Sequence, residues 1–302
     1  MTLDQGRRRR QSSDPDDPSV PSTIYDTEYF LSNACDGLSD YLTGGVSVVK
    51  GRELDLLGVR AGHSVLDLGC GRGEVAAELL RRGAQPTAID YSWDAVALTG
   101  QLIGRQALVA QADGVALPFP DGSFDRVLLG DVIEHLPWPL AIRAMAEVDR
   151  VLAPGGWALV HTSPNTWFIA IVKPPLRIAL RLLRRHEVLA RFAEYDRLRG
   201  PMHPNELNPV TLPRLMRQAG VKAVTWVDRD VLRSGASEWT ENLTASRLVR
   251  IIGAVAGAWP FRLLLGNDMY ALVEASGTAP TRRTLAPSDS CSSPTAPPAT
   301  SD

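Results

Sequence analysis

The sequence has few cysteines and almost no net charge, and each of these absences excludes a class of protein. Its 302 residues include only three cysteines, Cys35, Cys70 and Cys291. Because these lie far apart, neither a disulfide framework nor a cysteine-rich zinc site is available. Thirty-two lysines and arginines stand against 34 aspartates and glutamates, a formal net charge of −2. That balance excludes a globally basic nucleic-acid-binding protein.

Long apolar runs and a signal peptide are also lacking. The longest apolar run, Ile251–Phe261, has 11 residues, whereas a membrane span needs roughly 20. The basic stretch Arg7–Arg10 is followed by the polar stretch Gln11–Pro18, where a signal peptide has an apolar segment. We therefore expect a cytoplasmic protein whose only contact with a membrane is peripheral.

Composition divides the chain into two tails and one domain. Residues 1–21 combine four arginines with Ser, Asp and Pro, and 19 of the 26 residues in 277–302 are Ser, Thr, Pro or Ala. Such compositions cannot bury a core, so both tails are predicted to be disordered. The folded domain is predicted to cover residues 22–276, with insertions at about 163–207 and 230–266.

Short apolar runs alternate with helical patterns in this domain. The alternation predicts an α/β fold, a doubly wound seven-stranded mainly parallel sheet with helical cap insertions. The predicted strands are Ser64–Leu68, Pro86–Asp90, Leu108–Gln111, Phe124–Gly130, Trp157–Thr162, Val221–Asp228 and Asp268–Ala275. The predicted helices lie near Gly73–Arg82, Trp93–Ile103, Leu140–Leu152 and Leu212–Ala219, and Ala153–Gly156 is predicted to form the turn into the fifth strand.

A glycine-rich turn follows the first predicted strand. Glycines at 69, 71 and 73 let the backbone adopt positive φ and approach a ligand beside a helix N-terminus. The spacing is not the dinucleotide pattern G-x-G-x-x-G, because the third glycine comes one residue early. Asp67, inside the strand, suits a cationic amino-acid group better than a pyrophosphate.

Acidic residues follow the next strands in chain order. Asp90 ends the second strand, 17 residues after Gly73, where a carboxylate can accept from both ribose hydroxyls. Asp113 follows the third strand and can accept from an adenine amine, and Asp131 follows the fourth. Each acid alone is more often a cap or turn residue, but their order on successive strand ends indicates a nucleoside cofactor.

These motifs resemble class I S-adenosylmethionine-dependent methyltransferases, of the small-molecule branch that includes ubiquinone- and menaquinone-type enzymes. The resemblance is close over roughly 60–165, loose over 205–275, specific for the cofactor and weak for the substrate. It implies a Rossmann-like methyltransferase fold. The matching stretches are Val65–Glu74, Ala88–Asp90, Ala112–Asp113, Leu117–Asp125, Asp131–Leu136 and Arg150–Gly156.

The resemblance implies S-adenosylmethionine as cofactor and a role for each matching residue. The glycine turn would cradle the methionine part, with Asp67 on its amino group, while Asp90 would hold the ribose. Asp131 would lie beside the sulfonium and the acceptor. Tyr29 would cover the cofactor, with core packing as the alternative. The implied cofactor-binding residues are Asp67, Gly69, Cys70, Gly71, Gly73, Asp90, Tyr91, Ala112, Asp113, Asp131 and Tyr29.

Methyl transfer to a hydroxyl is helped by a general base, for which histidine is the usual choice. The catalytic candidates are His135, which follows the fourth strand, and His203, which opens the segment returning to the sheet. Glu134 beside His135 is a third candidate, and an orienting role is the alternative for His135. His161, inside the fifth strand, is interpreted as a packing residue.

The acceptor is predicted to be a small molecule, bulky or lipophilic, because two apolar-rich insertions are expected to cover the cofactor site. After the fourth strand, enzymes that methylate nucleobase amines carry an Asp/Asn-Pro-Pro-aromatic turn, but this chain reads Asp131-Val-Ile-Glu. No nucleic-acid partner is therefore expected. The region also offers no set of oxygen ligands, so the enzyme is predicted to need no metal. The leading prediction is methyl transfer to an oxygen, or a carbon, of the acceptor.

The insertions provide the remaining information on partners. Residues 175–185 predict a helix with Arg177, Arg181, Arg184 and Arg185 on one face. This helix is interpreted as a contact with an anionic membrane surface, an active-site lid or a solvated face. The apolar segment 246–265 is predicted to pack against the first insertion, a second subunit of a homo-oligomer, or lipid.

Two other functional classes remain as alternatives. The same fold is compatible with a protein or RNA methyltransferase, although the charge disfavours RNA. It is also compatible with a non-catalytic cofactor-binding or membrane-scaffold protein, which the complete set of cofactor motifs disfavours.

Overall fold

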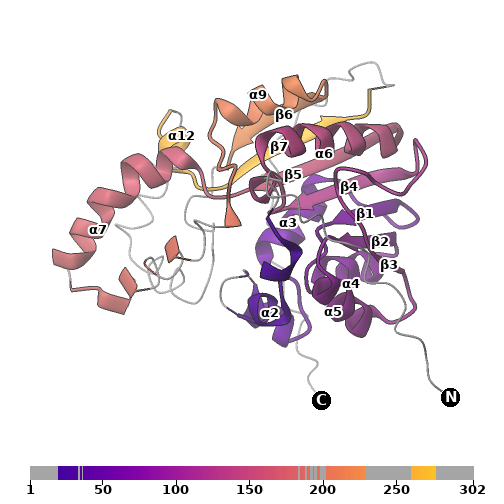
Figure 1. Ribbon diagram of the computed structural model, residues 1–302, viewed down its shortest axis with the longest axis horizontal. Helices are drawn as coiled ribbons and strands as arrows, with labels where there is room; N and C mark the ends of the chain where they lie inside the picture. The colour runs from indigo at the N-terminus through magenta and orange to yellow at the C-terminus, as the bar shows by residue number, and fades with distance from the viewer. Residues whose placement is uncertain are drawn as a thin grey trace, which may run out of the picture.

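A seven-stranded sheet organises the computed structural model (Figure 1). The structure describes residues 20–32, 35, 37–182, 184–187, 189–190, 193, 196–197, 202–228 and 260–276. The strand order is β3-β2-β1-β4-β5-β7-β6, and β7 runs antiparallel to both of its neighbours. The predicted doubly wound, mainly parallel sheet is therefore confirmed. The strands are β1 Ser64–Leu68, β2 Gln85–Asp90, β3 Leu108–Gln111, β4 Phe124–Gly130, β5 Leu152–Thr162, β6 Lys222–Val227 and β7 Met269–Glu274.

Strand β5 differs most from the sequence prediction. It begins at Leu152 rather than at Trp157, so the predicted turn over 153–156 lies inside the strand. Leu152 pairs with Phe124 of β4, and an irregularity in the register precedes the pair Arg126–Trp157. Gly155 provides the positive φ, 79°, in this irregular stretch. A bulge therefore stands where the sequence predicts a turn.

Apolar residues on alternate sides of the central strands bury both faces of the sheet. Leu66 and Val127 contact the cluster that includes α6 and α9, whereas Val65 and Leu128 contact the cluster that includes α3 and α4. This is the period of two expected of a sheet covered on both faces. These helices and their neighbour α5 are α3 Val48–Leu56, α4 Glu74–Arg81, α5 Trp93–Ile103, α6 Trp138–Val151 and α9 Thr211–Gln218.

The N-terminal part contains short helices, of which α3 was not predicted. Ser47 caps α3 by accepting from the N–H of Lys50, and Leu54 packs under β1 and β4. Glu53 is buried on the same helix. A carboxylate on the buried face disrupts the apolar period that a helix prediction requires. The shorter elements before α3 are η1 Ser22–Ile24, α1 Thr27–Phe30 and α2 Leu38–Leu42.

Helix α7, Lys173–Leu182, follows the π-helical turn η3, Phe168–Val172, and projects away from the sheet (Figure 1). The predicted helix over 175–185 is shorter than expected, because it ends at Leu182 and Arg184 has a φ of 53°. Arg184 and Arg185 therefore do not extend the face of Arg177 and Arg181, and this part of the prediction is wrong.

Several predictions concern residues that the structure does not describe. The tail predictions for 1–19 and 277–302 lie outside the described residues, as does 246–259 of the second insertion. The end of that insertion contains α12, Arg262–Leu265. In the described parts of the chain, no helix is long and apolar enough to cross a bilayer.

Candidate functional site

The glycine turn, Gly69–Gly73, connects β1 to α4, and all three of its glycines have positive φ. A Cβ on Gly73 would lie 2.9 Å from the Cα of Thr99 in α5, and a Cβ on Gly69 would lie 2.3 Å from Val132. A Cβ on Gly71 would meet only the Phe30 ring, at an ordinary 3.6 Å. Backbone conformation requires all three glycines, and close packing additionally requires Gly73 and Gly69.

Asp90 is held beside this turn by two backbone N–H groups. Its Oδ2 accepts from Gly71 at 3.0 Å and its Oδ1 accepts from Ser92 at 2.8 Å. Burial raises the pKa of this carboxyl, while the backbone donors act in the opposite direction. The glycine turn thus orients the carboxylate that is predicted to hold the ribose.

Asp67 has a buried carboxylate oxygen that a bound ligand would pair with. The residue is buried in β1, and its Oδ2 has no hydrogen-bond partner among the described residues. Burial raises the pKa of this carboxyl to about 7. Since buried polar atoms are nearly always paired, an ammonium group beside the glycine turn would satisfy this oxygen. The chain's own donors and acceptors therefore fit the amino-acid part of S-adenosylmethionine.

The other predicted cofactor residues have more local contacts. Cys70 is buried, and its Sγ accepts from the Thr99 hydroxyl at 3.4 Å. Asp113 is exposed and accepts from the N–H of Val115 at 3.0 Å, as in an Asx turn. Tyr91 is 41% exposed. Their roles in binding, and that of Ala112, stay predictions.

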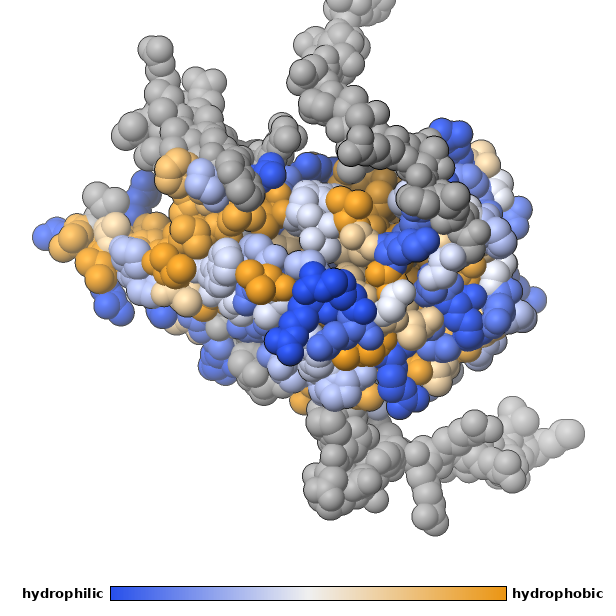
Figure 2. Space-filling view, turned by 90° about the horizontal axis from the view of Figure 1, so that it is seen from above, coloured by the Kyte–Doolittle hydropathy of each residue, from blue (hydrophilic) through white to orange (hydrophobic). Residues whose placement is uncertain are grey.

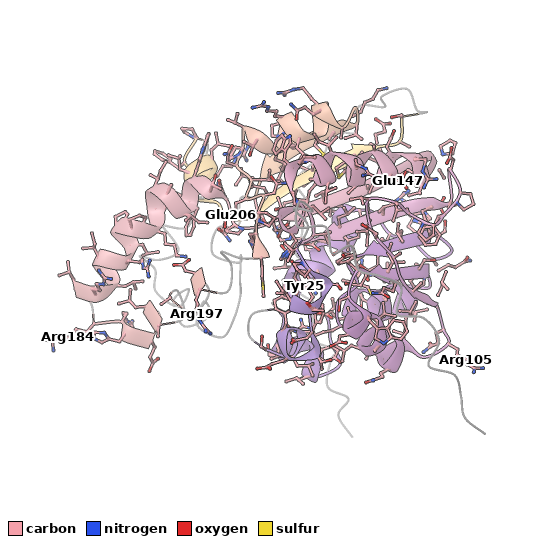
Figure 3. The ribbon with its side chains drawn as sticks, viewed as in Figure 1. Tyr25, Arg105, Glu147, Arg184, Arg197 and Glu206 are labelled. Carbon is pink, nitrogen blue, oxygen red and sulfur yellow. The ribbon has the colours of Figure 1, made fainter. Side chains whose placement is uncertain are left out.

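The two predicted base candidates lie together with two tyrosines. The rings of His135 and His203 are 4.6 Å apart, and the Tyr25 hydroxyl lies 2.9 Å from His135 Nδ1. The Tyr29 ring packs edge-on against Tyr25 at 5.4 Å. Tyr25 lies near the middle of the molecule in the view of Figure 3. These four residues, from three separate segments, form what we call the histidine cluster.

Two oxygens lie 2.9 Å from His135 Nδ1, the carbonyl oxygen of Met202 and the hydroxyl oxygen of Tyr25. The carbonyl only accepts, so a hydrogen bond to Met202 makes Nδ1 the donor, and the Tyr25 oxygen then shares this hydrogen as a second acceptor. In this tautomer Nε2 holds a lone pair. Burial lowers the pKa of His135, which keeps the ring neutral at pH 7. The side chain is therefore prepared to accept a proton at Nε2.

Asn205, which the sequence analysis missed, connects the two sides of the histidine cluster. Its Nδ2 donates to the carbonyl of Ile133 at 3.3 Å, and its N–H donates to the carbonyl of Glu134 at 3.2 Å.

Glu134, the third catalytic candidate, is buried and accepts from the Thr162 hydroxyl at 3.0 Å. Burial and the neighbouring Asp131 raise its pKa well above the usual range. Its catalytic role stays a prediction.

A second group, the carboxylate-rich cluster, was not anticipated. His161 Nδ1 lies 3.1 Å from both Glu53 Oε1 and Asp131 Oδ1, and its Nε2 lies 3.7 Å from Asp268 Oδ1. His161 is therefore more than the packing residue that the sequence indicated. The four members come from α3, the end of β4, β5 and the residue before β7. Only the folded sheet brings these segments together, so no local signal could have identified the cluster.

A third group, the cation-rich cluster, ties the N-terminal segment to the glycine turn. Glu74 pairs with Arg72 at 2.7 Å and with Lys50 of α3 at 2.8 Å. The fully buried Arg72 also donates to the carbonyls of Phe30 at 3.1 Å and Cys35 at 3.4 Å. The motif residue Arg72 thus holds α1 against the turn.

Comparison with known proteins agrees with this geometry. Residues 66–160 match the family described as "Methyltransferase domain". Over 122 residues the chain is 38% identical to a ubiquinone biosynthesis O-methyltransferase of Albidiferax ferrireducens, covering 37% of this chain and 47% of that protein. It is 37% identical over 107 residues to a demethylmenaquinone methyltransferase of Beutenbergia cavernae, covering 35% and 43%. These matches span about half the length of the curated relatives.

The fold has solved counterparts as well. The structure of phosphoethanolamine N-methyltransferase 2 of Haemonchus contortus, in complex with S-adenosyl-L-methionine, covers 84% of this chain with a TM-score of 0.55. The match covers 57% of that chain at 16% identity, so the likeness is one of fold. The sheet order, the glycine turn, the Asp67 oxygen without a partner among the described residues and the sequence matches agree: residues 66–160 lie in a class I S-adenosylmethionine-dependent methyltransferase domain.

Proposed function

We propose that this protein transfers the methyl group of S-adenosylmethionine to an oxygen, or a carbon, of a small lipophilic ring compound. The observation that carries the proposal is the orientation of His135. Its Nδ1 faces the Met202 carbonyl, which leaves the Nε2 lone pair for a substrate proton. A hydroxyl acceptor is favoured because removal of its proton is the step that a neutral imidazole assists.

In this mechanism the chain's residues bind, orient and move one proton. Asp67, the glycine turn and Asp90 would hold the cofactor, which would supply an electrophilic methyl group on a positively charged sulfonium. His135 Nε2 would take the hydroxyl proton of the acceptor as the acceptor oxygen is methylated. Alignment and exclusion of water provide the remaining acceleration.

The lipophilic class of acceptor is supported by the α7 region and by the relatives. Two curated relatives are named for steps on ubiquinone and demethylmenaquinone, which are lipophilic rings. Hydrophobic atoms gather at the α7 end of the molecule in Figure 2. Several apolar side chains there are half or more exposed. They are Ile171 at 53%, Ile178 at 57%, Leu182 at 79% and Phe261 at 50%.

We further propose that α7 rests on an anionic membrane from which such an acceptor is taken. Arg181, Arg184 and Arg185 are exposed beside the apolar side chains, and Arg184 lies at the end of α7 far from the sheet (Figure 3). Arginines flanking exposed apolar residues suit an anionic lipid surface.

Calorimetric titration with S-adenosylhomocysteine tests the cofactor site first. The wild-type protein should bind, and Asp90→Ala should weaken binding roughly tenfold or more through loss of hydrogen bonds to a charged group. Asp121→Ala, at a side chain that is 81% exposed before β4, is the matched control. No binding by folded wild type would refute the proposed function.

The base is tested by methyl transfer to a panel of prenylated phenols, with release of S-adenosylhomocysteine as the signal. His135→Gln should lower kcat about 100-fold or more, the usual contribution of a general base. The wild-type rate should fall on acidification, when the imidazole is protonated. His186→Gln, an exposed histidine beyond α7, is the control. An unaffected kcat in His135→Gln would favour a carbon acceptor or another base.

Membrane contact is tested by co-sedimentation with phosphatidylglycerol and phosphatidylcholine vesicles. Leu182→Glu should abolish binding to the anionic vesicles. Leu42→Glu is the matched control, because Leu42 is 71% exposed at the end of α2. Equal binding of both variants would contradict the proposed α7 contact.

A further inference from the structure

Beneath Asp131 lies a buried cluster that the proposed reaction does not use. His161 is 4% exposed and Glu53 2%, whereas the Asp131 side chain is 41% exposed. Only one carboxylate of the carboxylate-rich cluster therefore reaches the surface of the strand ends. The other two, with the imidazole, lie inside the protein behind it.

The backbone directs Asp131 outward. Its φ of 55° lies in the left-handed region, which a non-glycine residue adopts at a cost. Its N–H donates to the carbonyl of His161 at 3.2 Å, and the Ser163 hydroxyl lies 3.4 Å from its Oδ1. The same β5 residue thus contacts Asp131 through its backbone and through its ring. This double attachment is more than packing requires.

We propose that His161 is a positioning residue that, as a buried imidazolium, holds the Asp131 carboxylate ionised and directed at the positive sulfonium. Glu53, at the same distance from Nδ1, adjusts the strength of this contact. The inference rests on the proposed function, because the sulfonium belongs to the cofactor. The inference gives a role to two residues, His161 and Glu53, that belong to no cofactor-binding motif.

The electrostatics support this assignment. Burial alone would lower the pKa of His161, but Asp131, Tyr270 and Glu53 raise it well above the usual value. Burial would raise the pKa of Asp131, but His161 lowers it to about 2. Burial raises the pKa of Glu53 to about 7. At pH 7 the ring is therefore charged and Asp131 ionised, while Glu53 is half protonated.

The negative charge near the sulfonium should then increase as pH rises through 7. One N–H at Nδ1 faces both Glu53 and Asp131, so ionised Glu53 competes for it and the ring neutralises the Asp131 charge less. The groups that face the ring are Glu53, Asp131, Asp268 and Tyr270. Lys50 acts on Asp131 from α3, and His135 acts on it from the 3-10 turn η2, Ile133–His135.

The test compares affinities for S-adenosylmethionine, a cation at sulfur, and S-adenosylhomocysteine, a neutral thioether. Calorimetry at pH 6 and pH 8 gives the ratio of the two dissociation constants for wild type, His161→Gln and Glu53→Gln. The preference for the sulfonium should fall about tenfold in His161→Gln. In wild type it should rise between pH 6 and pH 8, and in Glu53→Gln it should not.

Nuclear magnetic resonance of the histidine rings provides a readout independent of binding. The His161 ring should remain protonated at pH 7 in wild type, and Asp131→Asn should lower its pKa. His186→Gln is the control for assignment and affinity. A neutral His161 ring at pH 7, or an unchanged sulfonium preference in folded His161→Gln, would overturn the inference.

Two further outcomes separate folding and function. If His161→Gln does not fold, Glu53→Gln decides: a pH-dependent preference equal to that of wild type overturns the inference, and its loss supports it. If wild type binds neither compound, the proposed function fails together with the inference. If it binds both with preferences insensitive to these variants, only the inference fails.

Discussion

Helix α3 contributes to two buried charge clusters, one with an excess of positive groups and the other with an excess of carboxylates. In the cation-rich cluster, Glu74 is shared by Lys50 and Arg72. In the carboxylate-rich cluster, one imidazole, that of His161, is shared by three carboxylates. Lys50 and Glu53, one turn apart on α3, belong to different clusters.

The pKa values of the two glutamates show what this difference means. Burial would raise the pKa of Glu74, but Lys50 and Arg72 outweigh it and lower the pKa to about 2. Burial raises the pKa of Glu53 to about 7, because His161 and Lys50, which lower it, are opposed by the carboxylates of Asp131 and Asp268. In the cation-rich cluster, the excess positive charge keeps Glu74 ionised, so it permanently connects the glycine turn to the N-terminal segment. In the carboxylate-rich cluster, the excess negative charge makes Glu53 titrate near neutral pH.

The largest effect is expected when the cation-rich cluster loses its carboxylate. Glu74→Gln should lower the free energy of unfolding by about 3–5 kcal/mol at pH 7, because it leaves Arg72 charged and buried without its carboxylate. Urea denaturation measures the loss. Glu78→Gln on the same helix is the control, because its partners Arg81 and Arg82 are 49% and 24% exposed. It should lose less than about 1 kcal/mol.

A smaller effect, visible only as pH changes, is expected from the carboxylate-rich cluster. The pKa of Glu53 rises on folding from 4.5 to about 7. A raised pKa contributes stability that is complete below pH 4.5 and is lost as pH rises through 7. Glu53→Gln, which cannot ionise, should remove up to about 3 kcal/mol of this decline. Melting temperatures from pH 5 to pH 8 measure it, and an unchanged slope would contradict the assignment.

Glu74 should show the opposite dependence in acid. Its pKa falls on folding from 4.5 to about 2, so its contribution is present above pH 4.5 and is lost as pH falls toward 2. Glu74→Gln should therefore differ most from wild type near neutral pH and approach it below pH 3. A difference that persists at pH 2 would show that packing, and not charge, connects Glu74 to its partners.

The smallest effect is expected from Lys50→Met. Lys50 is 22% exposed at its side chain, and Arg72 remains to neutralise Glu74. The loss in urea denaturation should be about 1 kcal/mol, in the range of a partly solvated pair. A loss as large as that of Glu74→Gln would show that Lys50, rather than Arg72, is the principal partner.

The three positions should therefore respond in a fixed order of size, Glu74 and Lys50 at pH 7 and Glu53 across the range from pH 5 to pH 8. That order depends on burial and on how many partners each charge retains, and not on residue type. Agreement would extend the comparison of the two clusters from geometry to energy.

Much of the fold was predictable because its signals are local. The strand β1, the glycine turn and Asp90 follow one another closely along the chain and form a pattern that the sequence shows directly. The alternation of apolar runs predicted all seven strands. Helix α3 was missed because Glu53 and Lys50 interrupt its apolar period. Strand β5 was predicted too short because a bulge at Gly155 resembles a turn in sequence.

The sequence predicted the cofactor-binding half of the candidate site better than the half that contains the histidine cluster. Residues that bind through a motif, such as Asp67 and Asp90, follow strand ends and can be found in sequence. His135 was found because it follows β4, but its tautomer depends on the carbonyl of Met202, 67 residues away. The interruption of α7 at Leu182 was not predicted, because it depends on the backbone of Arg184.

By itself, the sequence determined the sheet, the glycine turn and the class of cofactor, because periodicity and φ preferences act between neighbouring residues. The tertiary structure alone decided which charges share an environment. Glu53, Asp131, His161 and Asp268 span more than 200 positions along the chain, yet three contacts of 3.1–3.7 Å join them. The pKa of a buried group depends on those distances, and no local pattern encodes them.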